Sequence, residues 1–474
     1  MRPIIRTGVI AIVASFLLAG CAAFSPDGGM SFVADTAGRE LGKDIAAIRN
    51  DEDASAAREA VVRLLKRPLT ADAAVQVALL NNRGLQAAYS ELGIAEARMV
   101  AASLPPSPTL SLSRLAGAGE VEIEGKLLGD IIALATLPKR AEGAAMRFRQ
   151  AQLRAADETL RVAQETRRAW YRAVSSQQLV TYLTEAKSAA DAAAELSERL
   201  GKTGAINKLD QARQQTFYAE TVAQLATARQ NAAGDRERLV RAMGLWGGDL
   251  EFRLPSALPA LPARPLVQPA IEREAIRRRI DMQMARIETE VLAGTLDLTQ
   301  ATRFVDVLEL AGLDQRTKKN GEVERQRGAE VELRIPIFDL GESRVRQAEL
   351  GYMQAVHRLA ETAVNARSQA RDAYRGYRAS YDIAGHYQRE ILPLRQIISD
   401  EMLLRYNAMQ IDVFALLTEA RQRIAANVAA IEAQRNFWLA STTLSAAVIG
   451  GMPGAAAASP TIAVAAGGGE AGGH

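Results

Sequence analysis

The chain has few side chains of the types that carry out catalysis or bind metals. It has one cysteine, Cys21, and three histidines, which excludes a disulfide framework and a Cys/His zinc site. His357 and His386 lie on helical patterns without a partner at ligand spacing, and Met282 and Met284, two apart on a helix, face different directions. No Ser/His/Asp order, phosphate loop or HExxH motif is present. The sequence therefore predicts no enzyme, no cofactor and no metal site.

The single thiol lies where a lipid could be attached. Residues 1–20 begin with two arginines and continue with an uncharged, mostly apolar run from Gly8 to Leu18, too short to span a bilayer. Leu18-Ala19-Gly20-Cys21 then resembles the lipobox of bacterial lipoproteins, whose cysteine is acylated and becomes the N-terminus. Ala22 replaces the aspartate that retains many Gram-negative lipoproteins at the inner membrane. We expect a signal peptide, a stably anchoring lipid on Cys21 and an outer-membrane address; the alternative is a buried free cysteine.

The composition favours long helices over stacked globular domains. The chain has 474 residues and is 48% hydrophobic but only 5% aromatic, because much of the apolar content is alanine. Its 58 basic and 55 acidic residues nearly balance. That balance excludes a polybasic nucleic-acid binder and an acidic disordered protein.

The sequence is a tandem duplication with an offset of roughly 200 residues. Thr136–Lys139 corresponds to Ile335–Phe338, and Arg199-Leu200 corresponds to Arg405-Tyr406. Each half predicts a shorter helix, a β-hairpin and two long helices. The predicted helices are Thr70–Ser103, Pro138–Leu200 and Asn207–Leu245 in the first half, and Gln268–Leu292, Phe338–Tyr406 and Asp412–Ile449 in the second. A helix over Phe338–Tyr406 would be about 100 Å long, with a kink at Pro393.

Two of these helices carry uncharged seams of small residues. Alternate steps of four and three residues from Ala141 to Leu183, and from Val345 to Ile383, meet no charged side chain. This period of 3.5 residues predicts helices packed closely side by side over a long distance. An ordinary antiparallel coiled coil would have the same periodicity.

The predicted hairpins alternate apolar and polar residues. Thr109–Ser113 pairs with Glu120–Glu124 in the first half, and Val305–Val307 pairs with Glu330–Ile335 in the second; the alternation is weaker over Lys126–Leu134. Such strands suit either lipid on one face and a wet lumen on the other, or a half-buried soluble sheet. Four strands are too few to close a membrane barrel alone.

The ordered set of these motifs resembles the TolC-like outer-membrane efflux factors over about Leu69 to Gly451. The matching stretches are Leu69-Thr70 to Ala74-Val75, Asn81-Asn82, Pro105–Ser111, Leu137–Arg140, Pro336–Gly341 and Ile391–Pro393 followed by Arg405-Tyr406. The resemblance implies a mainly α fold with a small β part. Duplicated long helical hairpins would form a trimeric α-barrel through the periplasm, and four strands per chain would contribute to a shared 12-stranded outer-membrane β-barrel.

The implied function is that of a passive exit duct in a tripartite efflux system. An inner-membrane pump, of the RND type, and a periplasmic adaptor would deliver small molecules or metal ions to a homotrimer, and the pump would set the cargo. The alternatives are a structural coiled-coil lipoprotein without a pore and a type I secretion channel. The expected organisation is a signal peptide (1–20), a lipidated linker (21–68), a first repeat (69–249, hairpin about 108–136), a Pro-rich linker (250–267), a second repeat (268–450, hairpin about 302–335) and a disordered Gly/Ala-rich tail (451–474).

The resemblance also assigns roles to the two turns between long helices. The residues expected to contact the adaptor are Arg199, Leu200, Gly204, Arg405 and Tyr406. In the second turn Met409-Gln410 stands where a glycine is common in the family. Asp412, Glu419 and Asp210 are the candidates for an acidic ring that constricts the pore and favours cations; each could equally be a solvated charge at a helix end.

Overall fold

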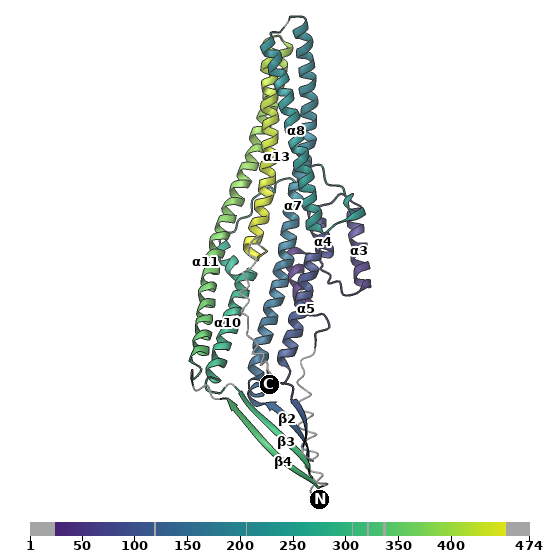
Figure 1. Cartoon of the computed structure of the whole chain (residues 1–474). Helices are drawn as coiled ribbons and strands as arrows, with labels where there is room; N and C mark the ends of the chain where they lie inside the picture. The colour runs from purple at the N-terminus through teal and green to yellow at the C-terminus, as the bar shows by residue number, and fades with distance from the viewer. Residues whose placement is uncertain are drawn as a thin grey trace.

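A computed structural model describes residues 24–117, 120–204, 206–305, 307–319, 322–334 and 338–451. Long helices form an elongated body, with a sheet at one end and two helix–helix turns at the other (Figure 1). The expected signal peptide, Cys21 and the tail from residue 452 lie outside the described residues. The helices are α2 (Met30–Leu41), α3 (Asp51–Leu65), α4 (Ala71–Asn81), α5 (Arg83–Ser103), α6 (Ile131–Ala135), α7 (Leu137–Lys202), α8 (Lys208–Met243), η1 (Gly247–Leu250), α9 (Ile271–Arg278), α10 (Ile280–Ala301), α11 (Glu342–His386), η2 (Tyr387–Ile391), α12 (Leu392–Asn407) and α13 (Val413–Ile449).

The two long helical hairpins predicted from the duplication are present. In the first half α7 runs without interruption for 66 residues and returns through α8. In the second half α11 is followed by five residues of π-helix, η2, and then by α12 and α13. The π-helix ends two residues before Pro393, which has no N–H to donate and whose ring crowds the preceding turn. The sequence predicted a kink at Pro393; the structure has this stretch of π-helix just N-terminal to the proline.

Each shorter helix is divided in two, whereas the sequence predicted single helices. The Asn82 side chain accepts a hydrogen bond from the Leu85 N–H at 3.1 Å, so that it ends α4 and caps α5. Arg279 separates α9 from α10; its buried guanidinium donates to Asp281 at 2.6 Å and to Gln369 at 2.8 Å. The segment expected to be a lipidated linker also contains two helices, α2 and α3.

The first predicted seam is largely buried from Ala155 onward, and the second is buried less completely. On α7 the buried stripe includes Ala155, Thr159, Val162, Thr166, Ala169 and Ala173, as expected. On α11 the predicted seam leaves the buried side after Ala373, and Ile383 is exposed. The buried stripe there is Ala366, Ala370, Ala373, Tyr377, Tyr381 and Ala384. The two tyrosines set this register because both rings pack on Phe437 of α13, with centroids 5.4 and 5.7 Å apart.

The Pro-rich linker between the repeats is extended and bound to long helices. The Tyr381 hydroxyl donates to the Pro262 carbonyl at 3.0 Å, and the Trp438 indole N–H donates to the Pro259 carbonyl at 3.0 Å. In the middle of the linker, the Leu258 N–H donates to Gln178 of α7 at 3.2 Å. The linker therefore ties α7 of the first half to α11 and α13 of the second.

The four strands form one antiparallel sheet in the order β1-β2-β3-β4. They are β1 (Thr109–Gly117), β2 (Glu120–Asp130), β3 (Val307–Lys319) and β4 (Glu322–Arg334). Strand β3 is much longer than predicted and pairs with all of β4. The weak strand pattern over Lys126–Leu134 is wrong after Asp130, because the Asp130 carboxylate accepts from the Ala133 N–H at 2.8 Å and starts helix α6.

Candidate functional site

One face of the sheet is polar and rich in carboxylates. Residues paired in register lie on the same face and alternate along each strand. Glu124 of β2 is thus on the same face as Ser113, Gln315 and Gln326 of the other strands. The described strand residues of this acidic face include nine carboxylates and three basic residues. Its carboxylates are Glu120, Glu122, Glu124, Asp130, Glu309, Glu322, Glu324, Glu330 and Glu332.

The opposite, apolar face exposes large hydrophobic side chains near the helical body. These are Leu110, Leu112, Leu127, Leu310, Val331 and Leu333. Phe304 and Phe338 are exposed where the sheet joins the helices, and Phe338 is 99% accessible. Exposed apolar patches of this kind mark contacts with lipid or protein. Among the described residues, no helix is both long and apolar enough to cross a bilayer.

The two helix–helix turns lie together at the end of the molecule farthest from the sheet (Figure 1). The five residues expected to contact an adaptor are exposed or half-exposed in these turns. Arg199 and Arg405 each pair with a glutamate one helical turn earlier, Glu195 at 2.5 Å and Glu401 at 2.9 Å. The first turn places Gly204 at φ 73°, and the second places Met409 at φ 58° with its side chain 93% exposed. Met409 therefore adopts a backbone conformation that usually selects glycine.

The three gate candidates have different environments. The Asp412 carboxylate is exposed and accepts from the Ala415 N–H at 2.8 Å, which makes it the N-cap of α13. Asp210, in the first turn of α8, accepts from Asn207 at 2.7 Å and from Arg213 at 3.1 Å. Glu419 is buried against Arg395 of α12 at 3.0 Å, and one of its oxygens has no hydrogen-bond partner among the described residues. The structure does not gather these three carboxylates around one point within the chain.

A contact between the two hairpins was not expected from the sequence. Arg421 of α13 pairs with Glu220 of α8 at 2.9 Å, and its guanidinium lies 4.8 Å from the Phe217 ring centroid. Its counterpart in the duplication, Arg213, instead pairs within α8 with Asp210. The repeated Ala-Arg-Gln at 212–214 and 420–422 shows that the two arginines are equivalent in sequence. It could not show that Arg421 pairs with the other hairpin whereas Arg213 pairs within its own helix. We call Arg395–Glu419 and Arg421–Glu220 the tip ion pairs.

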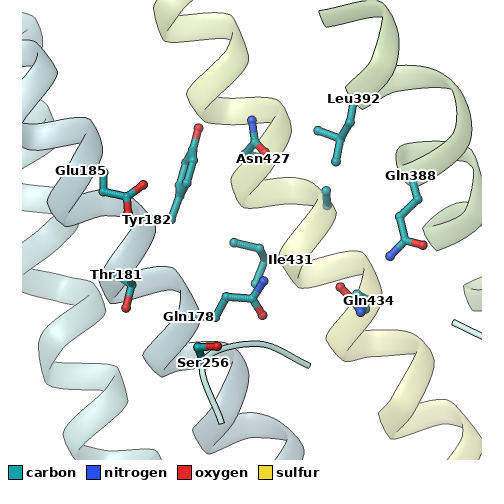
Figure 2. A pocket seen from close by; sticks show the side chains of 11 residues that line it. Gln178, Thr181, Tyr182, Glu185, Ser256, Gln388, Leu392, Asn427, Ile431 and Gln434 are labelled. Atoms are coloured by element: carbon teal, nitrogen blue, oxygen red, sulfur yellow. The ribbon is translucent and has the colours of Figure 1, made fainter. Parts of the chain in front are cut away.

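A hollow of about 260 Å³ separates the hairpins below the tip ion pairs. Figure 2 shows Tyr182 and Glu185 of α7 facing Asn427 and Ile431 of α13, with Gln388 of η2 on the far side. Burial raises the pKa of Tyr182 above its usual 10.0, although Arg423 opposes the shift. The hollow lies beside the π-helix, so the second hairpin is least supported where its first helix is irregular.

The described residues contain no group of three or more His, Cys, Asp or Glu side chains that could hold a metal ion. His386 pairs with Glu390 one turn along the chain, at 3.1 Å. The features that stand out are therefore a two-faced sheet at one end and two charged turns at the other.

Comparison with known proteins identifies the fold. No protein-family model and no curated protein matches the sequence. The outer-membrane channel OprN matches with a TM-score of 0.67 and 18% identity over 86% of this chain and 97% of its own. The outer-membrane protein VceC of Vibrio cholerae gives 0.67 and 14% over 80% and 96%, and the outer-membrane channel CmeC of Campylobacter jejuni gives 0.64 and 16% over 86% and 89%. The chain therefore has the fold of these outer-membrane channels, mainly α with duplicated helical hairpins and a small antiparallel sheet.

Proposed function

We propose that the chain is one subunit of a homotrimeric outer-membrane channel, the exit duct of a tripartite efflux system. The observation that carries the proposal is the sheet, which has an acidic face, an apolar face and two edges, β1 and β4, each paired on one side only. Unpaired edges must be satisfied by another strand, above all in lipid. Three copies joined edge to edge would close a ring of twelve strands, with the acidic faces around water and the apolar faces toward lipid.

The helical body supports the same assembly. Helix α12 buries none of its residues within the chain, yet it exposes large apolar side chains, and Leu394, Ile397, Ile398 and Leu404 form a row on one side. Helix α11 likewise exposes Leu350, Met353 and Val364. Apolar rows along helices of this length need a partner helix. Neighbouring subunits would supply it and enclose a helical duct.

The turns at the far end would form the closable aperture. Asp412 is exposed, so three copies around the threefold axis would form a ring of carboxylates that favours cations. Glu419 cannot contribute to that ring while it is buried against Arg395. Opening would require the second hairpin to swing outward and break the Arg421–Glu220 pair, which joins it to the first hairpin. The hollow next to the π-helix gives this movement room.

The partners follow from the two ends of the molecule. The exposed turn residues Arg199, Leu200, Gly204, Arg405 and Tyr406 would meet a periplasmic adaptor fed by an inner-membrane pump of the RND type. Lipidation of Cys21 would anchor the other end to the outer membrane. The cargo, small molecules or metal ions, would be set by the pump.

Planar-bilayer recording combined with the mass of the detergent-extracted protein tests the proposal. We expect a trimer that forms pores selective for cations. A monomer that forms no pores would refute the channel and favour a structural coiled-coil lipoprotein.

The gate is tested by neutralising the ring carboxylate Asp412 and the buried Glu419 separately and together. Asp412→Asn keeps the N-cap, because asparagine also caps helices well, and Glu419→Gln keeps a hydrogen-bond acceptor for Arg395. The double variant should conduct more or lose cation preference. Asp400→Asn, on an exposed carboxylate of α12, is the matched control. Currents unchanged from the control would refute the ring.

A further inference from the structure

The apolar face of the sheet changes character along the strands. Near the helical body its rows contain leucine, valine, alanine and glycine. Three rows farther out contain most of its charge. In register, Arg114 aligns with Ile123, Arg316 and Arg325; the neighbouring rows add Asp314 with Arg327 and Lys318 with Val323. We call the five basic residues the cationic belt: Arg114, Arg316, Lys318, Arg325 and Arg327.

The belt has far more positive charge than it needs to balance its own face. Asp314 is the single carboxylate among the described strand residues of that face. It pairs with Arg325, with Arg327 at 3.4 Å and with Arg316 at 3.7 Å. No ion pair is described for Arg114 or Lys318, whereas carboxylates are concentrated on the opposite face. An excess of positive over negative charge is therefore confined to one face and one level of the sheet.

The level of the belt matches a membrane boundary. From Leu308 to Arg316 the strand advances eight residues, about 26 Å at the usual rise, or about 20 Å of height at the tilt of strands in membranes. The exposed Phe304 and Phe338 lie at the opposite limit, where aromatic side chains gather at interfaces. The belt would thus lie where the lipid headgroups of the outer leaflet begin.

The belt would also continue between subunits. Arg114 lies on one edge strand, β1, and Arg325 and Arg327 lie on the other, β4. When β4 of one subunit meets β1 of the next, the basic side chains of both edges come into the same boundary region. Each junction would then present a basic cleft above apolar strand faces.

We propose that this cationic belt binds the phosphate groups of a phosphorylated glycolipid in the outer leaflet, whose acyl chains lie on the apolar rows below. Arginine forks match phosphate oxygens in pairs, and weakly hydrated guanidinium groups tolerate a lipid interface. Free phosphate would satisfy the charge but would leave the adjoining apolar rows uncovered. The inference rests on the proposed channel function, because it requires the apolar face to meet lipid.

Lipid binding to the full-length, delipidated protein in detergent tests the belt. Native mass spectrometry would measure binding of bisphosphorylated lipid A, of lipid A without phosphates and of phosphatidylethanolamine. Arg114→Gln with Lys318→Gln leaves the Asp314 cluster intact and should weaken binding of bisphosphorylated lipid A about thirtyfold, for two basic groups beside an anionic surface. Lys126→Gln with Lys319→Gln removes the same charge from the acidic face and should leave binding unchanged. In the unaltered protein, high salt should weaken binding and excess inorganic phosphate should not displace the lipid.

Three results would overturn the belt: equal affinity of the two double variants, undiminished binding of lipid A without phosphates, or displacement by inorganic phosphate. Bilayer conductance of the same preparations separates this inference from the proposed function. Pores without phosphate-dependent lipid binding refute the belt alone. A monomeric protein without pores refutes the channel itself.

Discussion

The two helical hairpins have similar lengths but differ in continuity. In the first, α7 is uninterrupted and buries small residues from Ala144 to Ser197. In the second, the corresponding stretch is interrupted by η2, and α12 beyond it buries nothing within the chain. The duplicated halves therefore share the same outline, but the second is less buried near its tip. This difference supports the proposal that the second hairpin moves while the first stays in place.

The turn of the second hairpin also has the less favourable backbone conformation. The first turn uses Gly204 for its left-handed residue, and the second uses Met409. A side chain at such a backbone angle costs about 1 kcal/mol or more relative to glycine. The tip ion pairs hold the less favourable turn in place: one within the second hairpin and one across to the first.

The largest effect is expected from Arg395→Gln. Removing this partner leaves the Glu419 carboxylate buried and unpaired, which should destabilise the second hairpin by about 3 kcal/mol. Hydrogen exchange of α12 and α13 should accelerate, and channel conductance should rise. Arg405→Gln removes the same charge from an exposed pair on α12 and should cost about 0.5 kcal/mol or less. Equal effects of the two substitutions would contradict a special role for the buried pair.

Pro393→Ala tests the interruption itself. Restoring an N–H to the helix interior should stabilise the η2–α12 segment by about 1 to 3 kcal/mol and slow amide exchange over residues 387–407. Pro138→Ala is the matched control in the first hairpin, where the proline lies in the first turn of α7 and costs little. If both variants slow exchange equally in their own hairpins, the contrast in stiffness does not come from Pro393.

Asp157→Asn probes the joint where the hairpins meet. Asp157 of α7 accepts from the Gly451 N–H at 2.8 Å, and burial raises its pKa above 3.8, helped by Asp281 and Glu158 and opposed by Arg279. The native state therefore holds this proton more tightly than the unfolded chain, so the associated stability is present at low pH and is lost as pH rises through the native pKa.

Asparagine keeps the acceptor for Gly451 without the charge, so Asp157→Asn should raise the melting temperature at pH 7. The gain should shrink as the pH falls toward about 4, near the usual pKa of the carboxyl. Asp400→Asn, on an exposed residue, serves as the control. A gain independent of pH would exclude the buried carboxylate as its source.

The smallest effects are expected in the turns. Met409→Gly should stabilise the second turn by about 0.5 kcal/mol, since relief of strain is partly offset by the flexibility of glycine when unfolded. Gly204→Ala should destabilise the first turn by about 1 kcal/mol from backbone strain alone, because among the described residues, its chain neighbours aside, no atom lies within 4 Å of the added methyl group. Amide exchange at the ends of α7 and α12 measures both, and the two changes should have opposite signs.

Much of the fold could be predicted from periodicity and repetition. The long helices, the four strands, the seam on α7 and the irregularity near Pro393 all follow from local patterns. The helix breaks at Asn82 and Arg279 could not be predicted in this way. They depend on the hydrogen bonds of these two side chains, a helix cap for Asn82 and a distant partner, Gln369, for Arg279. The buried seam on α11 differs from the predicted one because Tyr377 and Tyr381 pack on Phe437 of α13. Local periodicity cannot predict this contact between helices.

The candidate site was predicted less completely for the same reason. Asp412, Glu419 and Asp210 were equivalent as carboxylates near turns. In the structure one is an exposed cap, one is buried with Arg395, and one is held by Arg213. The role of a charged side chain on a helix depends on the residues of the neighbouring helix that it contacts. The local sequence does not show which residues those are.

For the proposed trimeric outer-membrane channel, the two unpaired edges of the sheet have a further consequence for biogenesis. A lone subunit would present β1 and β4 as open templates for any extended chain, and in lipid their free backbone groups would be very costly. Insertion and assembly should therefore be a single concentration-dependent event, with no stable membrane-inserted monomer. Newly exported chains would need an escort in the periplasm until two others arrive.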